Sequence, residues 1–182
     1  MKKIIALLLA LLMVFGFTAC GGGGTDDQVT KVGFIYIGSA TDGGFTQAHD
    51  TARQKVEEHF DGAVKTYFLE NVKEDKEAVK TAALNLMDQG CTIIIGNSFG
   101  FMDAMVNTAK DNPTVKVMHA SGYKRSDNLG TYFGRMEQPD YLAGIVAGKM
   151  TKTNKIGFVL PYSIPECIRE VDSFTVGARE VN

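Results

Sequence analysis

From Lys31 onward the sequence alternates regularly between short apolar runs and longer amphipathic segments. The apolar runs predict strands at 31–37, 63–70, 92–97, 115–120 and 131–136. The amphipathic segments predict helices at 45–60, 74–90, 101–112 and 138–152, because their apolar residues recur at helical spacing. Strands with few polar residues between such helices are typical of a parallel sheet that helices cover on both faces. We therefore expect a doubly wound α/β lobe over residues 31–150.

Residues 154–163 predict one further strand, and residues 164–182 predict one further helix with Pro165 in its first turn. One strand and one helix cannot bury a core of their own. They either extend the first sheet or begin a second lobe. The polar stretch before them resembles a crossover between lobes, so we expect residues 151–182 to be a crossover and the start of a truncated second lobe.

The N-terminal residues resemble a targeting sequence. Lys2 and Lys3 precede an apolar run over residues 4–17, which is too short for a permanent membrane span and typical of a signal peptide. Cys20 follows a small residue and precedes four glycines, as in a bacterial lipobox, although Phe17 stands where leucine is usual. We expect a signal peptide at 1–19, a lipid on Cys20 and a flexible tether at 20–30, which would hold the protein on the extracytoplasmic face of the cell membrane. The alternative is an ordinary secretory signal with an incidental cysteine.

Charge and reactive residues exclude several classes of function. Without Lys2 and Lys3 the chain has 17 basic and 21 acidic residues, a net charge of −4, which argues against nucleic acid as a partner. The histidines are scattered without the spacing of metal ligands, and no catalytic triad has supporting motifs, so we expect no metal, no cofactor and no enzymatic activity. Cys91 and Cys167 fall in separate segments and are expected to be small buried hydrophobes without a disulfide.

The loop "GSATDGGF" at 38–45 follows the first predicted strand, where ligands bind in open α/β sheets. Its glycines lack the spacing of phosphate-binding loops, no lysine follows them, and Asp42 would repel phosphate. Asp42 could cap the next helix, accept hydrogen bonds from a ligand, or do both. Phe45 could pack against its helix or stack on a planar ligand, and we favour stacking. The predicted site includes Asp42, Gly44 and Phe45.

The loop "NSFGF" at 97–101 repeats this combination after the third predicted strand. Asn97 and Ser98 supply amide and hydroxyl groups, and an amide that both donates and accepts suits the edge of a purine. Phe99 supplies a second ring. Phe99 and Phe101 could both be core residues at the start of a helix; we assign that role to Phe101 and place Phe99 in the site.

Several long segments together are similar to the basic membrane protein family, namely "KVGFIYIGSATDGGFTQAHDTARQ", "QGCTIIIGNSFGFMDA", the run from "HASGYKRSDN" to "NKIGFV", and "IPECIREVDSFTVGAR". These are lipoprotein receptors of the periplasmic-binding-protein-like type I fold that serve ABC importers of purine nucleosides and bases. The resemblance implies a second lobe and a ligand held in the cleft between lobes. It also implies that the ring at Phe45, often tryptophan in the closest relatives, stacks on the base, while polar groups near Asp42 and Asn97 contact its edge.

We therefore predict a membrane-anchored receptor, not an enzyme, that captures a purine nucleoside or base and delivers it to an ABC transporter permease. A sugar-binding receptor of the same fold would also use aromatic stacking, but with more charged and amide groups around the hydroxyls. A signalling lipoprotein that senses the same ligand is a further alternative. An extracytoplasmic nucleoside-processing enzyme is disfavoured because the sequence shows no catalytic set.

Overall fold

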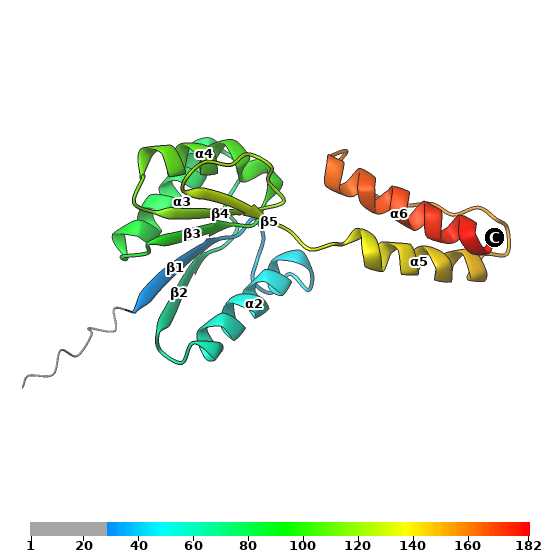
Figure 1. Ribbon diagram of the computed structural model, residues 1–182, viewed down its shortest axis with the longest axis horizontal. Coiled ribbons are helices and arrows are strands. Elements are labelled where there is room, and N and C mark those ends of the chain that lie inside the picture. The colour runs from blue at the N-terminus through cyan, green and yellow to red at the C-terminus, as the bar shows by residue number, and fades with distance from the viewer. Residues whose placement is uncertain (1–28) are drawn as a thin grey trace, which may run out of the picture.

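The computed structural model describes residues 29–182, which form a parallel five-stranded sheet with helices on both faces and a pair of parallel helices beside it (Figure 1). The strands are β1 (Thr30–Ile35), β2 (Val64–Leu69), β3 (Ile93–Gly96), β4 (Lys116–Ala120) and β5 (Leu129–Tyr132), in the order β2-β1-β3-β4-β5. The predicted α/β class with a parallel, doubly wound sheet is confirmed. The expected signal peptide, Cys20 and nearly all of the expected tether lie outside the described residues.

The larger part of the core lies between the sheet and helices α3 (Lys76–Asp88) and α4 (Met102–Asp111). A short 3-10 turn, η1 (Phe99–Phe101), leads into α4. The sheet contributes Ile35, Ile94 and Val117 to this core, and the helices contribute Leu86 and Met105; all five are fully buried. The apolar run of β1 is therefore explained by burial on both faces of this strand, whereas in β3 Ile94 is buried and Ile93 and Ile95, on the other face, are only partly buried.

Helix α2 (Phe45–His59) covers the opposite face of the sheet (Figure 1). Beneath it lie Val32, Phe34 and Tyr36, the residues of β1 and its extension that alternate with those facing α3. A polar network joins the helix to this face: the Tyr36 hydroxyl donates to Asp50, and Arg53 donates to both Asp50 and Thr66 of β2. These contacts fix α2 on the sheet, and its first residue, Phe45, then lies at the carboxyl end of β1.

The strand order places a switch point between β1 and β3. The chain runs from β1 to the neighbour on one side, β2, and then crosses to β3 on the other side of β1. Loops after two such strands diverge to opposite faces of the sheet and leave a crevice, which is where open α/β sheets bind ligands. The loops at 38–44 and 97–101, which the sequence singled out, are the two loops at this point.

Helices α5 (Glu137–Met150) and α6 (Pro165–Val181) lie side by side, run in the same direction and project from the carboxyl end of β5 (Figure 1). They approach closely through glycine: a Cβ atom at Gly144 would lie 2.0 Å from the carbonyl oxygen of Phe174, and one at Gly177 would lie 2.1 Å from that of Tyr141. A Cβ atom at Gly148 would likewise lie 2.6 Å from the carbonyl oxygen of Ala178, so both Gly144 and Gly148 pack against α6.

The strand expected within residues 154–163 is wrong. These residues form an irregular, mostly exposed connection between α5 and α6, in which the Phe158 ring contacts the Phe174 ring edge to face at 5.1 Å. An apolar run becomes a strand only when another strand accepts and donates its backbone hydrogen bonds, and among the described residues none lies beside it. The helix after it is confirmed, with Pro165 at its first position. The division into lobes at residue 150 stays a prediction.

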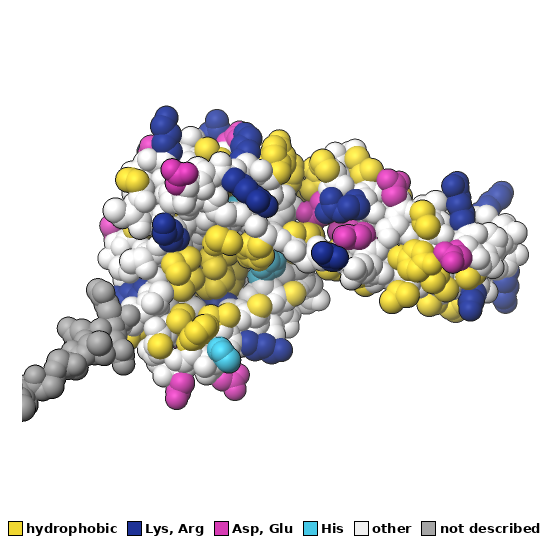
Figure 2. All heavy atoms as spheres, in the orientation of Figure 1, with side chains coloured by type: hydrophobic (Ala, Val, Ile, Leu, Met, Phe, Trp, Pro, Cys, Tyr) yellow, Lys and Arg dark blue, Asp and Glu magenta, His cyan; other side chains and the backbone are white. Residues whose placement is uncertain are grey.

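Apolar side chains gather on the sheet face beside α2 and along α5 (Figure 2). On α5 they are Leu142, Val146 and Met150, which are 60%, 55% and 74% exposed and share one face of the helix because they are four residues apart. None of the helices formed by residues 29–182 is both long enough and apolar enough to cross a membrane.

Candidate functional site

A cavity of about 370 Å³ lies at the carboxyl ends of β1 and β3, between their loops and the residues that lead into α6. This volume is within the range of small-molecule sites in proteins. The cavity is lined by Ile37, Phe45, Glu74, Asn97, Ser98, Phe99, Gly100, Ser121, Pro161, Tyr162, Ile164, Glu166 and Cys167. We call it the switch-point pocket. Four of the six predicted ligand-binding residues line it, namely Phe45, Asn97, Ser98 and Phe99.

Phe45 is the first residue of α2 and is 45% exposed. Its ring meets that of His49, one helical turn later, edge to face with centroids 4.7 Å apart. The imidazole supports one part of the phenyl ring, and the exposed part borders the switch-point pocket. The ring is therefore held in place and still available to a ligand.

Asp42 caps helix α2, as one of its two expected roles requires. Its Oδ1 accepts hydrogen bonds from the backbone N–H groups of Gly44 and Gln47 at 2.8 and 3.0 Å, and its Oδ2 accepts from that of Thr46 at 2.9 Å. The N–H groups of Gln47 and Gly44 lower the pKa of Asp42 to about 2. Neither Asp42 nor Gly44 lines the switch-point pocket; both lie in the turn that presents Phe45.

Asn97 is 1% exposed and lies at the end of β3. Its Oδ1 accepts a hydrogen bond from the backbone N–H of Ile37 at 3.0 Å, which joins the two loops of the switch point. This bond fixes the orientation of the amide, because only the oxygen can accept from an N–H. The Nδ2 group then has no partner among the described residues. A buried amide donor without a partner is costly in a folded protein.

Ser98 is held from two sides. Its hydroxyl donates to Glu74, and its carbonyl oxygen lies 2.5 Å from Nε2 of His119. His119 is 1% exposed, and burial lowers its pKa, so the ring is neutral and its Nε2–H donates to the carbonyl. His119 therefore supports the loop from behind and does not line the pocket.

The two phenylalanines of the 97–101 loop differ in burial as expected. Phe101 is fully buried in the core against α4, whereas Phe99 is only partly buried and lines the switch-point pocket. The Phe99 ring lies near that of Tyr123, with centroids 6.4 Å apart.

Sequence reasoning missed the two carboxylates of the pocket, Glu74 and Glu166. Glu74 comes from the loop after β2, and Glu166 from the first turn of α6, where it accepts a hydrogen bond from the Ser121 hydroxyl. Both lie in charged stretches of sequence that are typical of solvated surface, so no local signal marks them. Among the described residues that line the pocket, none is Lys, Arg or His. The pocket is therefore suited to a neutral or cationic ligand and opposes a phosphate group.

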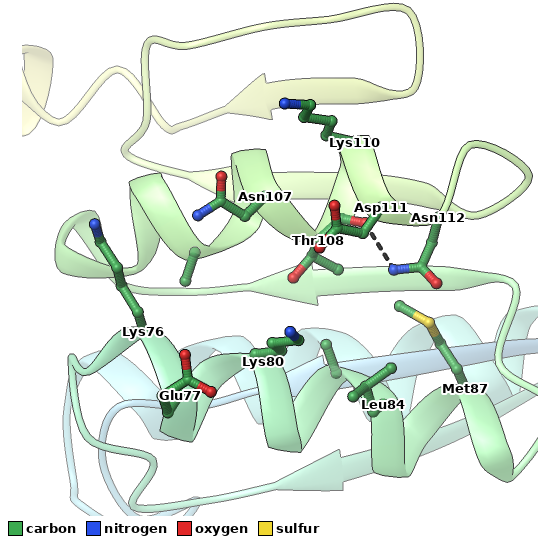
Figure 3. A pocket seen from close by; sticks show the side chains of 12 residues that line it. Lys76, Glu77, Lys80, Leu84, Met87, Asn107, Thr108, Lys110, Asp111 and Asn112 are labelled. Carbon is green, nitrogen blue, oxygen red and sulfur yellow. Dashed lines mark hydrogen bonds between the residues drawn. The ribbon is translucent and has the colours of Figure 1, made fainter.

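A second cavity, of about 390 Å³, lies in the groove between α3 and α4 (Figure 3). Its lining mixes charged side chains, among them Lys76, Lys80 and Lys110, with apolar and neutral polar ones, and it contains no residue of the predicted site. The side-chain amide of Asn112 is turned back to the carbonyl of Thr108, at 2.9 Å (Figure 3). This groove lies on the outer surface of the helices, and the sequence gives no reason to connect it with a ligand.

The fold is the one found in solute-binding proteins of the periplasmic-binding-protein type. A solute-binding protein of an ABC transporter system from Aeropyrum pernix K1 superposes with a TM-score of 0.69 at 18% identity, over 84% of this chain and 44% of that one. Residues 29–182 match the sequence profile of the Bmp family, described as ABC transporter substrate-binding protein PnrA-like. The chain belongs to this family.

Two relatives of similar sequence identity are named for different ligands. A purine-binding protein of Brucella abortus is 38% identical over 96% of this chain and 49% of its own length. A protein of Haloferax volcanii named as an ABC transporter glucose-binding protein is 37% identical over 91% of this chain and 41% of its own length. The chain thus spans about half the length of the curated relatives it matches. Its family and fold are those of substrate-binding proteins, which work outside the cytoplasm and are not enzymes.

Proposed function

We propose that this chain forms one wall of a receptor that captures a purine base or nucleoside in the switch-point pocket and delivers it to an ABC importer. The observation that carries the proposal is the pairing of an exposed ring, Phe45, with an unpartnered buried amide donor, Asn97 Nδ2, on one pocket. A flat heterocycle with hydrogen-bonding groups on its edge fits both. The name of the Brucella abortus relative supports the same ligand class.

Each of the two groups has a physical reason to bind such a ligand. Stacking of a base on an aromatic ring contributes about 1–3 kcal/mol and suits any base, because every base has a π face. The donor of Asn97 recovers the hydrogen bond it lost on folding when a ring nitrogen or carbonyl oxygen of the ligand accepts from it. Ser98 and the second ring, Phe99, complete the predicted site on the same loop. Asp42 and Gly44 contribute by fixing the turn before Phe45. Neither lines the pocket, so their contribution to binding is indirect.

The rest of the proposed receptor follows from the family and from the sequence. A second lobe, beginning near residue 151, supplies the other wall, and the ligand stabilises the closed form by contacting both lobes. Lipid on Cys20 holds the receptor on the outer face of the membrane, where the permease of the importer receives the ligand. A form that ends at Asn182 is then expected to bind purines more weakly than the two-lobed protein.

A binding screen tests this proposal. Full-length protein is titrated calorimetrically with adenine, guanine, hypoxanthine, their nucleosides, adenosine monophosphate and glucose. Bases or nucleosides should bind, and the monophosphate should bind much more weakly because its charge meets the two carboxylates of the pocket. Equal affinity for adenosine and its monophosphate would contradict the assignment of the switch-point pocket.

A sugar is the second candidate, because the Haloferax volcanii relative is named for glucose and sugars also stack on aromatic rings. Binding of glucose in the same screen, without binding of any purine, would establish it. Chromatography of each ligand after incubation distinguishes capture from chemical conversion. Recovery of unchanged ligand is expected of a receptor.

A further inference from the structure

We infer that Glu74 is a specificity-determining residue of the switch-point pocket, and that its free carboxylate oxygen accepts a hydrogen bond from an N–H group on the edge of the ligand ring. This inference rests on the proposed function and extends it to the hydrogen-bonding pattern of the ligand.

The position of the Glu74 carboxylate is fixed by the loop opposite. Its Oε1 accepts hydrogen bonds from the Ser98 hydroxyl and, at 3.1 Å, from the backbone N–H of Gly100. Ser98 is itself held through its carbonyl by His119, so the carboxylate is bound to a rigid group. No donor among the described residues pairs with the other oxygen, Oε2, while Glu74 lines the pocket together with Phe45 and Asn97.

Gly100 provides the space in which this carboxylate lies. A Cβ atom at residue 100 would be 2.3 Å from both Cδ and Oε1 of Glu74 and 2.7 Å from Oε2. The backbone of Gly100 does not have the positive φ that favours glycine. The absence of a side chain at this position is therefore explained by the carboxylate, and not by the course of the chain.

Glu74 and Asn97 are complementary in chemistry. A carboxylate accepts hydrogen bonds only, and Asn97 offers a donor, since its oxygen is already bonded to Ile37. A ligand edge that carries a donor beside an acceptor matches the pair. The exocyclic amino group and a ring nitrogen of adenine have this pattern, as do the ring N–H and the carbonyl of hypoxanthine. A purine without a substituent at position 6 lacks the donor once its imidazole nitrogen carries ribose.

The test compares adenosine with purine riboside, which differ by the 6-amino group alone, and adenine with purine in parallel. Calorimetry on the full-length protein should show adenosine binding about 10- to 100-fold more tightly than purine riboside, as expected for a hydrogen bond to a charged group. Glu74→Gln should remove most of this preference by weakening adenosine and leaving purine riboside nearly unchanged. Gly100→Ala should act likewise, because the carboxylate is displaced although it is still present.

The matched control is Glu77→Gln, three residues later on the exposed surface of α3 and outside the pocket, which should leave the preference intact. Thermal unfolding of each variant shows whether it is folded. If Gly100→Ala does not fold, Glu74→Gln alone decides the test. An unchanged preference in Glu74→Gln would overturn this inference and leave the proposed function standing. If the wild-type protein binds none of these four compounds and no other base or nucleoside of the screen, the proposed function is wrong and this inference fails with it.

Discussion

Asn97 illustrates how one side chain can serve both the fold and the ligand. Its oxygen joins the loops after β1 and β3 through Ile37, and its nitrogen has no partner in the described residues. Folding therefore leaves a buried donor at the point where the two loops meet. Ordered water or a ligand can supply the acceptor that such a group lacks, and under the proposed function the ligand does so.

Phe45→Ala is expected to weaken binding of purines to the full-length protein by about 1–3 kcal/mol, the contribution of one base stacked on one ring. Calorimetric titration measures the loss. Phe60→Ala is the matched control, because Phe60 is similarly exposed, 49% against 45%, but lies at the other end of α2. Unchanged affinity in Phe45→Ala would remove Phe45 from the site.

Asp42→Asn is expected to destabilise the protein at neutral pH and to do so less as the solution becomes acidic. Backbone N–H groups lower the pKa of Asp42 from its ordinary 3.8 to about 2 in the folded state. Its contribution is therefore complete above about pH 4 and is lost as the pH falls toward 2. Urea unfolding of both proteins at several pH values between 6 and 3 measures this. A difference in stability that is constant over this range would contradict the charged cap.

At the scale of residues, the sequence predicts those site residues that follow directly after a predicted strand and belong to an uncommon combination of rings and amides. Phe45, Asn97, Ser98 and Phe99 were recognised because rings and amides follow apolar runs, and the structure brings all four to one pocket. Glu74 could not be recognised, because its position in the pocket depends on hydrogen bonds from Ser98 and Gly100, which are more than twenty residues away in the sequence. Their proximity exists only once β2 and β3 flank β1.

At the scale of elements, helix α2 must be held firmly for Phe45 to present its ring. Asp50, only 5% exposed, accepts hydrogen bonds from Arg53 at 2.6 Å and from Gln54 at 2.7 Å. Burial opposes ionisation of Asp50, but the hydrogen bonds from Arg53 and Gln54 outweigh it and hold its pKa below the ordinary value. Arg53 also stacks over the Phe68 ring of β2, 4.9 Å from its centre, and so links the helix to the sheet edge.

Arg53→Met is expected to reduce the free energy of unfolding by about 3 kcal/mol, because Asp50 is left charged and buried without its partner. Lys55→Met, an exposed cation two residues later on the same helix, should change it by less than about 0.5 kcal/mol. Chemical denaturation monitored by circular dichroism measures both. Equal effects of the two substitutions would show that the network does not anchor α2.

The elements that sequence periodicity predicted correctly are those whose partners are near in the chain. Each strand from β1 to β5 pairs with a strand in the same segment, so pattern and pairing agree, although β5 is Leu129–Tyr132 and not the expected 131–136. Residues 154–163 have an equally apolar pattern but no neighbouring strand among the described residues, and they form no strand. Periodicity reports which residues prefer burial, whereas a sheet also requires a backbone that supplies hydrogen bonds.

At the scale of the whole molecule, the helices that cover the sheet bury more of their side chains than the α5–α6 pair does. Helix α3 buries Val79, Ala82, Ala83 and Leu86 against the sheet, whereas α6 buries only Cys167 and Gly177. The pocket is bounded by both parts, since the residues before α6 form one of its sides. The shape of the pocket therefore depends on how the well-packed lobe meets the less well-packed α5–α6 pair.

Hydrogen exchange is expected to reflect this difference. In a protein that ends at Asn182, the backbone amides of α6 should exchange faster than those of α3, because few buried contacts oppose local opening of the α5–α6 pair. Mass spectrometry of peptic fragments measures both rates in one experiment. Protection of α6 equal to that of α3 would show that the helix pair is as stable as the lobe.

The glycine contact between α5 and α6 has a mechanical consequence. Helices that touch backbone to backbone cannot slide independently, so the two form a single stiff arm, attached to the lobe by the short segment after β5. The arm is about 21 Å long, from the 14 residues of α5. A rotation of about 10° at its base would carry its tip about 4 Å over that length. Because Glu166 and its neighbours at the base of the arm border the pocket, a small adjustment around a guest molecule becomes a large displacement at the far end.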